Sequence, residues 1–375
     1  MRTVYTLALL GLMISLQSCL RFENRYTKIP PGPWRAVLLL DPSAVTPNPK
    51  GEPLDDKLNL SFDEVTGGEL PFNFEVEYTD DPTFQIVFLN GEERIVVKDV
   101  SFGRSKSRAK DSIRINFPIY DTYITGLYEE GIIEGEYVVN YRNNYRIPFI
   151  ARFGMDYRFT QIPKPAELDL TGTWEVTFGP GGDEPSPFAG IGEFVQTENE
   201  LKGTFRTETG DYRYLHGVVS GTKVYLSVFD GAHAFLFEAK LDPEQETMVG
   251  SFRSGTHYRT VWQARRNPEA KLTNPYQLTS VTDAGAPIDF SFLSAAGDTV
   301  SLSDEAFAGK VKLVQLFGTW CPNCRDETRF LLDYLQSHQH ENLQVLGIGF
   351  ERYRDTERSL AALERYKKQM NVPYP

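Results

Sequence analysis

The sequence predicts a multidomain protein in which a duplicated all-β body precedes a shorter, incomplete α/β domain. A chain of 375 residues is long enough for two or three compact units, each with its own hydrophobic core. The 19 Tyr and 25 Phe residues exceed what a helical bundle needs, and aromatic residues favour strands. Short runs of alternating polarity continue to about residue 266, after which the pattern changes to β-α-β-α.

Bulk composition excludes two classes of protein. The formal net charge of −12 is spread through the chain without an acidic or basic tail. Nucleic-acid binding would require a basic patch, so we expect no nucleic-acid partner. The three cysteines, Cys19, Cys321 and Cys324, are too few for a framework of structural disulfides.

Residues 1–19 have the pattern of an export signal. Arg2 precedes an apolar run at residues 7–14, which is shorter than the about 20 residues that span a bilayer. The segment ends in Leu16-Gln17-Ser18-Cys19, which resembles the processing box of bacterial lipoproteins. This resemblance implies a lipid on Cys19 that anchors the chain in the bacterial cell envelope, outside the cytoplasm, in the periplasm or at the outer membrane. An ordinary secretory signal with a chance cysteine is the alternative.

Two β-barrel-like domains are predicted after a proline-rich linker at residues 20–33. The first, residues 34–165, follows Gly32-Pro33 and opens at Trp34, and the second, residues 166–270, has the matching sequence Gly172-Thr173-Trp174. We interpret the two as an internal duplication. Strands are predicted to begin near Trp34, Phe72, Phe84, Arg94, Ile113, Tyr123, Ile133 and Tyr145, and then near Trp174, Ile191, Leu201, Tyr212, Val224, Ala234, Met248 and His257.

A Gly-x-Trp opening and an arginine in the last of eight strands resemble the small up-and-down barrels of the lipocalin and avidin type. The resemblance implies that Trp174 packs on Arg265 or Arg266, and Trp34 on Arg152. Eight strands enclose an interior that holds packed side chains or one small ligand. A filled interior is the default expectation, and a ligand pocket is the alternative.

The α/β domain is predicted at residues 287–375, after a second linker at residues 271–286. A hairpin is expected over residues 288–302, followed by a buried parallel strand at 312–317 and directly by a helix. Pro322 suits the first position of that helix. A second strand at 343–350 and a second helix at 356–370 complete the β-α-β-α succession.

Cys321 and Cys324 form a Cys-x-x-Cys pair at the junction of the strand and the first helix. Unpaired N–H groups and the helix dipole at a helix N-terminus favour a thiolate, which is the attacking species in disulfide exchange. We therefore interpret Cys321 as the nucleophile. Cys324 lies one turn further along the helix, faces inward and would resolve a mixed disulfide.

Other kinds of site fit the cysteine pair less well. A structural zinc site needs two more ligands, and among the five histidines only His338 and His340 form a close pair in the sequence. A structural disulfide across two residues closes too small a loop to stabilise the fold much. We expect no metal and no other cofactor.

Residues 316–327 closely resemble the TlpA-type thioredoxin-like thiol-disulfide oxidoreductases that are anchored as lipoproteins, and the resemblance extends over residues 288–375. By position, Trp320 matches the aromatic residue before the redox pair, and Glu327 matches the acidic residue after it. With Pro322, these are the predicted supporting residues. Arg329 stands where the family usually has proline. A peroxide-reducing relative would carry Pro-x-x-x-Thr-x-x-Cys, which Gly318-Thr319-Trp320-Cys321 lacks.

The resemblance implies a membrane-anchored, extracytoplasmic thiol-disulfide oxidoreductase that acts as a reductase on protein disulfides. It also implies a membrane electron-donor thiol carrier, which would re-reduce the cysteine pair, and attachment to the membrane through the lipid on Cys19. The alternative is a cell-surface ligand-binding or scaffold lipoprotein whose β body is the functional part.

The resemblance further implies that the thioredoxin-like domain is truncated. In the family, a strand that begins at a cis-proline, another strand and a closing helix follow. Residues 325–375 suffice for the rest of the first helix, one strand and a second helix, and neither Pro373 nor Pro375 stands where the cis-proline is expected. We therefore expect an unpaired sheet edge and low stability or activity. Normal insulin reduction by residues 1–375 alone would contradict this expectation.

Overall fold

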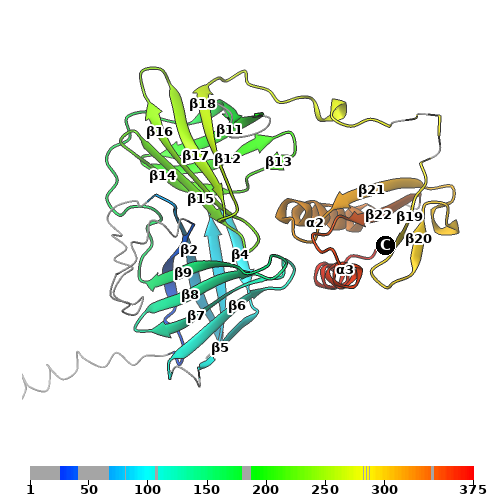
Figure 1. Cartoon of the computed structure of the whole chain (residues 1–375), viewed down its shortest axis with the longest axis horizontal. Coiled ribbons are helices and arrows are strands. Elements are labelled where there is room, and N and C mark those ends of the chain that lie inside the picture. The colour runs from blue at the N-terminus through cyan, green and yellow to red at the C-terminus, as the bar shows by residue number, and fades with distance from the viewer. Residues whose placement is uncertain are drawn as a thin grey trace, which may run out of the picture.

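The computed structural model describes residues 26–40, 67–80, 82–105, 109–179, 187–281, 283, 285–286, 288–338 and 342–375. Within them, two large antiparallel sheets precede a small α/β domain, so the predicted fold class is confirmed (Figure 1). The predicted signal peptide, with Cys19, lies outside the described residues. No helix among those described has both the length and the apolar character needed to cross a bilayer.

The first sheet is an up-and-down meander in which β1 also pairs with β9. The described residues contribute nine strands to it, whereas the sequence predicts eight. The additional strand, β5, has five residues and two large apolar side chains, Val100 and Phe102, which is too short a pattern to identify a strand. The strands are β1 (Gly32–Leu39), β2 (Glu69–Asp80), β3 (Thr83–Asn90), β4 (Glu93–Val97), β5 (Val100–Arg104), β6 (Asp111–Phe117), β7 (Thr122–Glu129), β8 (Ile132–Val139) and β9 (Tyr145–Phe153).

The second sheet closes into a barrel, because β10 pairs with β18 and β11 pairs with β12. Where the sequence predicts one strand near Tyr212, the structure has the two-residue strand β13 and then β14. Arg213 between them has a left-handed backbone (φ 66°), which interrupts the strand. The strands are β10 (Gly172–Phe178), β11 (Phe188–Thr197), β12 (Glu200–Thr207), β13 (Gly210–Asp211), β14 (Leu215–Ser220), β15 (Lys223–Phe229), β16 (Ala234–Asp242), β17 (Thr247–Ser254) and β18 (Tyr258–Arg266).

The two sheets open with the same local structure. Gly32 and Gly172 have φ values of 113° and 115°, a conformation that favours glycine. Two residues later, Trp34 and Trp174 are fully buried. Each indole N–H donates to the carbonyl four residues before it, at 3.2 Å for Trp34 and 2.9 Å for Trp174. This repeated geometry supports the interpretation of an internal duplication.

The predicted packing of a tryptophan on an arginine is confirmed in the second barrel. The Arg266 guanidinium lies 4.7 Å from the centre of the Trp174 ring, and the two residues are partners across β10 and β18. In the first sheet, the partner of Trp34 in the register is Phe153, whose ring centre lies 5.5 Å from that of the indole. The predicted partner, Arg152, lies opposite the neighbouring residue of β1.

Aromatic side chains fill the interiors of both sheets. In the second barrel, the ring of Phe205 lies 4.5 Å from that of Phe237 and 5.1 Å from that of Trp262. In the first, Phe88 packs on both Phe72 and Phe74. These interiors agree with the default expectation of packed side chains, and the burial of such rings is the main source of stability in the β body.

A loop of the second barrel completes the core of the first. This plug segment, residues 229–233, begins at the last residue of β15 and inserts Phe229 among the rings of the first sheet. The Phe229 ring lies 4.4 Å from that of Phe72 and 5.1 Å from that of Tyr137. Asn90 fixes the backbone of Phe229, accepting from its N–H at 3.2 Å and donating to its carbonyl at 2.9 Å. The first sheet and the second barrel therefore form one β body with a shared core. Among the described residues, the edge strands β4 and β5 of the first sheet are not paired with each other, and this barrel-like sheet is called the first barrel below.

Polar contacts reinforce the junction between the barrels. Arg158, in the connection between β9 and β10, donates to the Leu89 carbonyl at 2.9 Å and to Asn90 Oδ1 at 3.2 Å. It also donates to the hydroxyl and the carbonyl of Ser227, at 2.9 and 3.1 Å. Burial, together with a smaller effect of the charge of Arg35, lowers the pKa of Arg158 to about 9. Neutral oxygens of both barrels thus hold a buried cation.

His216 gives the β body a pH-dependent stability. Burial lowers the pKa of His216 to about 4, the charge of Arg158 acts in the same direction, and Glu200, 2.8 Å away, opposes both. The folded state therefore favours the neutral ring. The contribution is fully present above the unfolded pKa of about 6.5 and is lost as the pH falls from there through about 4.

We expect the free energy of unfolding of the wild type to fall below pH 6.5 relative to that of His216→Gln. The difference should grow by up to about 1.4 kcal/mol per pH unit. Urea unfolding of both chains at several pH values between 7 and 4.5 measures this effect. Parallel pH profiles for the two chains would show that His216 does not cause it.

The α/β domain combines a hairpin, two parallel strands and two helices. β21 and β22 pair in parallel, as predicted. The expectation that β21 is buried is wrong, since Val311 and Leu316 are 66% and 61% exposed. In the described part of the chain this sheet consists of β21 and β22 alone, so one edge of β21 has no partner strand. The elements are η3 (Pro275–Gln277), β19 (Ser291–Leu293), β20 (Thr299–Ser301), η4 (Glu305–Phe307), β21 (Val311–Phe317), α2 (Pro322–Ser337), β22 (Leu343–Gly349) and α3 (Thr356–Met370).

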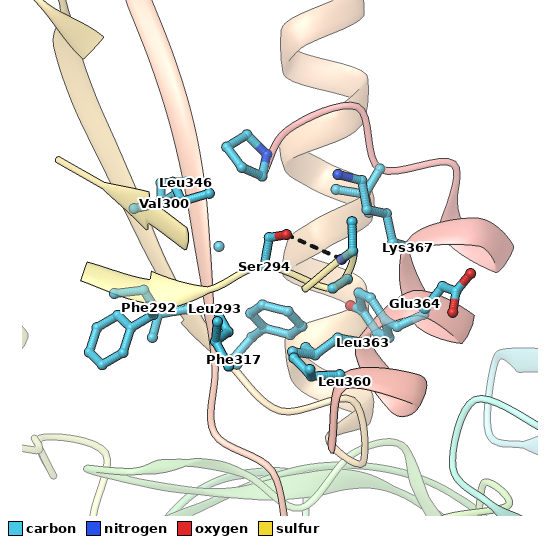
Figure 2. Close-up of a pocket in the computed structure, with 18 of the residues that line it drawn as sticks. Phe292, Leu293, Ser294, Val300, Phe317, Leu346, Leu360, Leu363, Glu364 and Lys367 are labelled. Atoms are coloured by element: carbon cyan, nitrogen blue, oxygen red, sulfur yellow. Dashed lines mark hydrogen bonds between the residues drawn. The ribbon is translucent and has the colours of Figure 1, made fainter. Parts of the chain in front are cut away.

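An apolar cavity of about 890 Å³ lies inside the α/β domain (Figure 2). Phe292 and Leu293 border it from the hairpin, Phe317 from β21, and Leu360 and Leu363 from α3. Leu360 and Leu363 of α3 thus line an open space. The small domain is therefore less densely packed than the aromatic interiors of the β body.

Candidate functional site

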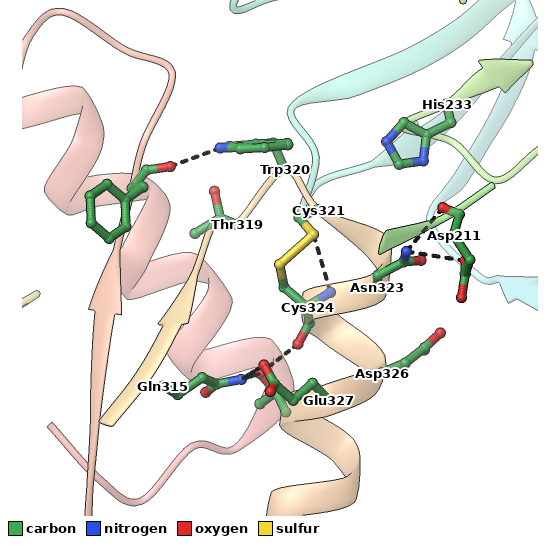
Figure 3. Close-up of a disulfide and its surroundings, with 12 residues drawn as sticks. Asp211, His233, Gln315, Thr319, Trp320, Cys321, Asn323, Cys324, Asp326 and Glu327 are labelled. Atoms are coloured by element: carbon green, nitrogen blue, oxygen red, sulfur yellow. Dashed lines mark hydrogen bonds between the residues drawn. A yellow bond between two sulfur atoms is a disulfide. The ribbon is translucent and has the colours of Figure 1, made fainter. Parts of the chain in front are cut away.

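The cysteine pair lies where β21 ends and α2 begins (Figure 3). Cys321 and Cys324 are joined by a disulfide, with their Cα atoms 5.2 Å apart. Cys321 is the N-cap of α2, and its Sγ accepts a hydrogen bond from the Cys324 N–H at 3.2 Å. Pro322 starts the helix, where its missing N–H leaves no hydrogen bond unmade. Both cysteines are partly exposed and lie at the positive end of the helix dipole.

Trp320 forms one wall of the site. Its indole N–H donates to the Phe350 carbonyl at 2.9 Å, and the Arg352 guanidinium lies 3.7 Å from the centre of the ring. The indole folds back over Gly318, where an added Cβ would lie 2.5 Å from the indole nitrogen. A side chain at position 318 would displace the indole, so glycine at this position permits the orientation of the ring beside the disulfide.

Glu351 belongs to the site although the sequence motif gives no sign of it. It accepts hydrogen bonds from the N–H and the hydroxyl of Thr319, at 3.0 and 2.8 Å. Burial raises the pKa of Glu351, and the bonds from Thr319 oppose this rise. Thr319 follows β21 and Glu351 follows β22. Because the carboxyl ends of parallel strands meet at one sheet edge, this rule could have identified Glu351 as a candidate.

Glu327 is linked to the cysteine pair through a chain of hydrogen bonds (Figure 3). The Gln315 amide donates to the carboxylate of Glu327 at 3.0 Å and to the hydroxyl of Thr328 at 3.0 Å. That hydroxyl donates to the Cys324 carbonyl at 2.9 Å. The predicted supporting residues Trp320, Pro322 and Glu327 thus all surround the redox pair, Glu327 from the exposed side of α2.

Side chains of the β body also reach the site. Asn323, between the two cysteines, accepts from Arg213 at 3.0 Å and donates to Asp211 at 3.1 Å. Arg325, directly after Cys324, donates to the hydroxyl of Tyr120 at 3.2 Å. No spacing or periodicity connects residues so far apart in the chain, so the sequence could not identify them. Among the described residues, no three His, Cys, Asp or Glu side chains gather to hold a metal ion.

Two sequence comparisons identify the family of the α/β domain. Residues 284–375 match the AhpC/TSA family. They form a thioredoxin-like domain. A curated relative, the thiol:disulfide interchange protein DsbE of Allochromatium vinosum, is 31% identical over 87 residues, or 23% of this chain and 44% of that protein. The chain thus spans less than half the length of this relative. Both matches confirm the thioredoxin-like resemblance that the sequence motif predicts.

Solved structures resemble the chain only weakly. A DUF3598-family protein of unknown function from Nostoc punctiforme is 10% identical, with a TM-score of 0.19. The alignment covers 62% of this chain and 94% of that one. The Burkholderia oklahomensis agglutinin is 11% identical, with a TM-score of 0.15 that covers 54% and 77%. Scores this low assign the β body to no family.

Proposed function

We propose that the chain is a membrane-anchored, extracytoplasmic thiol-disulfide oxidoreductase that acts as a reductase through Cys321 and Cys324. The observation that carries this proposal is the disulfide at the N-terminus of α2, within a thioredoxin-like domain. The match to a thiol:disulfide interchange protein supports the same class of reaction. A helix N-terminus stabilises the thiolate of the reduced pair and so favours attack by Cys321.

The reaction transfers two electrons to the substrate. The Cys321 thiolate attacks one sulfur of a substrate disulfide, that S–S bond breaks, and the first substrate thiolate leaves and takes up a proton. The Cys324 thiolate then attacks Cys321 Sγ, which releases the second substrate thiolate and re-forms the disulfide between the two cysteines. An external dithiol must reduce this disulfide before the next cycle.

The proposed substrates are protein disulfides, and the proposed electron donor is a thiol carrier in the membrane. A lipid on Cys19 would hold the chain in the envelope, in the periplasm or at the outer membrane, which the apolar run at residues 7–14 supports. Mass spectrometry of the mature N-terminus tests this anchor directly.

Packed aromatic interiors favour a scaffold role for the β body over capture of a ligand inside a barrel.

Trapping with Cys324→Ser tests the reductase proposal. Without the resolving thiol, the mixed disulfide on Cys321 cannot collapse, so substrate proteins should stay covalently attached. We expect complexes on non-reducing gels of envelope extracts that dithiothreitol dissolves. The double variant Cys321→Ser/Cys324→Ser is the matched control and should trap nothing. The proposal is contradicted if no complexes form although Cys321 is reduced and reactive.

A further inference from the structure

The redox face of the thioredoxin-like domain is docked on the β body. We define the docking contacts as the hydrogen bonds that Arg213, Asp211, Tyr120, Tyr141 and Asp121 of the β body make with the segments around the cysteine pair. They come from both barrels, and Figure 3 shows one of them, between Asp211 and Asn323 beside the cysteine pair. A partner that binds this face of α2 must therefore displace part of the β body.

Arg213 is the centre of the docking contacts. Its side chain is 6% exposed and donates to Asn323 and Asp326 of α2. The same guanidinium donates to Glu93 of the first sheet and lies 3.7 Å from Asp230 of the plug segment. Burial alone would lower the pKa of Arg213, but the surrounding carboxylates outweigh it and raise the pKa. One cation thus joins both barrels and the redox helix.

Further docking contacts lie on the other sides of the cysteine pair. Arg325 donates to the buried Tyr120 hydroxyl at 3.2 Å. Arg352, which covers the Trp320 ring, donates to the Tyr141 hydroxyl at 3.0 Å. The Tyr353 hydroxyl donates to Asp121 at 2.6 Å. These contacts occupy the surface that a folded protein substrate would need around its disulfide.

The interface between the β body and the thioredoxin-like domain can open. It consists of hydrogen bonds and ion pairs at the rims of the barrels, and polar interfaces between domains permit relative motion. The linker after β18 is mostly exposed along residues 267–281, so it does not restrict separation (Figure 1). Both cysteines remain partly exposed in the docked state, which leaves an approach for a small molecule.

We propose that the β body is an autoinhibitory partner of the redox face, held mainly by Arg213. In the docked state, Cys321 exchanges with small disulfides, whereas bulky protein disulfides reach it only after the docking contacts break. The inference rests on the proposed reductase function and adds its substrate access and regulation. Docking therefore selects substrates by their size, because the docked state admits small disulfides and the open state admits both kinds.

Single-turnover kinetics of the pre-reduced chain test this inference. Insulin serves as the protein disulfide and oxidised glutathione as the small one. The test variants are Arg213→Gln and, because loss of Arg213 leaves buried carboxylates unpaired, the double hydroxyl deletion Tyr120→Phe/Tyr141→Phe. All three sites lie in the β body, outside the thioredoxin-like domain. Arg206→Gln is the matched control, since Arg206 pairs with Glu193 on the exposed surface of the second barrel.

We expect the insulin rate to rise at least about fivefold relative to the glutathione rate in both test variants, the low end of usual coupling between sites. The control should keep the wild-type ratio. Small-angle X-ray scattering should show a larger radius of gyration for the test variants. The inference is overturned if exchange is intact and both test variants keep the wild-type ratio of rates. It is also overturned if both keep the wild-type radius of gyration. Absence of exchange with either disulfide in every chain would remove the reductase function, and this inference with it.

Discussion

Replacement of Cys321 by serine is expected to lower the rate of insulin reduction by at least about 1000-fold, the order of magnitude for loss of a catalytic nucleophile. A serine hydroxyl stays protonated at neutral pH even at a helix N-terminus, so the attacking anion is lost. Cys324 cannot replace it, because Cys321 holds the N-cap position that favours a thiolate, whereas Cys324 lies inside the first turn of α2.

Insulin turbidity with dithiothreitol as electron donor measures this loss. The matched control is Cys19→Ser, which removes the one cysteine outside the pair and should keep the wild-type rate. Far-ultraviolet circular dichroism of each variant confirms that the β body is folded. A Cys321→Ser chain that keeps a tenth of the wild-type rate would place the nucleophile elsewhere.

Replacement of Phe229 by alanine is expected to lower the free energy of unfolding by about 3–5 kcal/mol, the usual cost of removing a buried phenyl ring. Phe229 is fully buried, and its ring packs on Phe72, Phe88, Phe117 and Tyr137 of the first sheet. The cavity would lie in the core that the two barrels share, so both should lose stability together.

Urea unfolding of the wild type and of Phe229→Ala measures this effect. Phe330→Ala is the control, because that ring is 66% exposed on α2 and its loss should change stability by no more than about 0.5 kcal/mol. A loss below about 1 kcal/mol for Phe229→Ala would show that the plug segment contributes little to the core of the first sheet.

The sequence predicts those features of the fold that depend on local patterns. Gly172-Thr173-Trp174 and the alternating strands that follow predict the second barrel, and Pro322 predicts the start of α2. The exposure of Leu316 was not predictable from its strand, because burial depends on which other elements pack on that face of the sheet. β5 was missed because Val100 and Phe102 are its only large apolar side chains, which is too little alternation to indicate a strand.

The candidate site was predictable where its residues are contiguous. Cys321, Cys324 and Trp320 lie in one motif, and a strand-to-helix junction explains their chemistry. Arg213 and Phe229 act through the tertiary arrangement of the β body, and nothing in their sequence neighbourhood distinguishes them from other surface or strand residues. Glu351 lies between these cases, since pairing of parallel strands would have placed it at the site.

The plug segment sets an order for biosynthesis. A chain that emerges amino end first, whether from a ribosome or across a membrane, presents all strands of the first sheet well before residue 229. Until then the rings of Phe72 and Phe88 have no partner from the second barrel, and the nascent first sheet presents an open aromatic core to its surroundings. Completion of the earlier barrel must therefore wait until residue 229 of the later one has emerged.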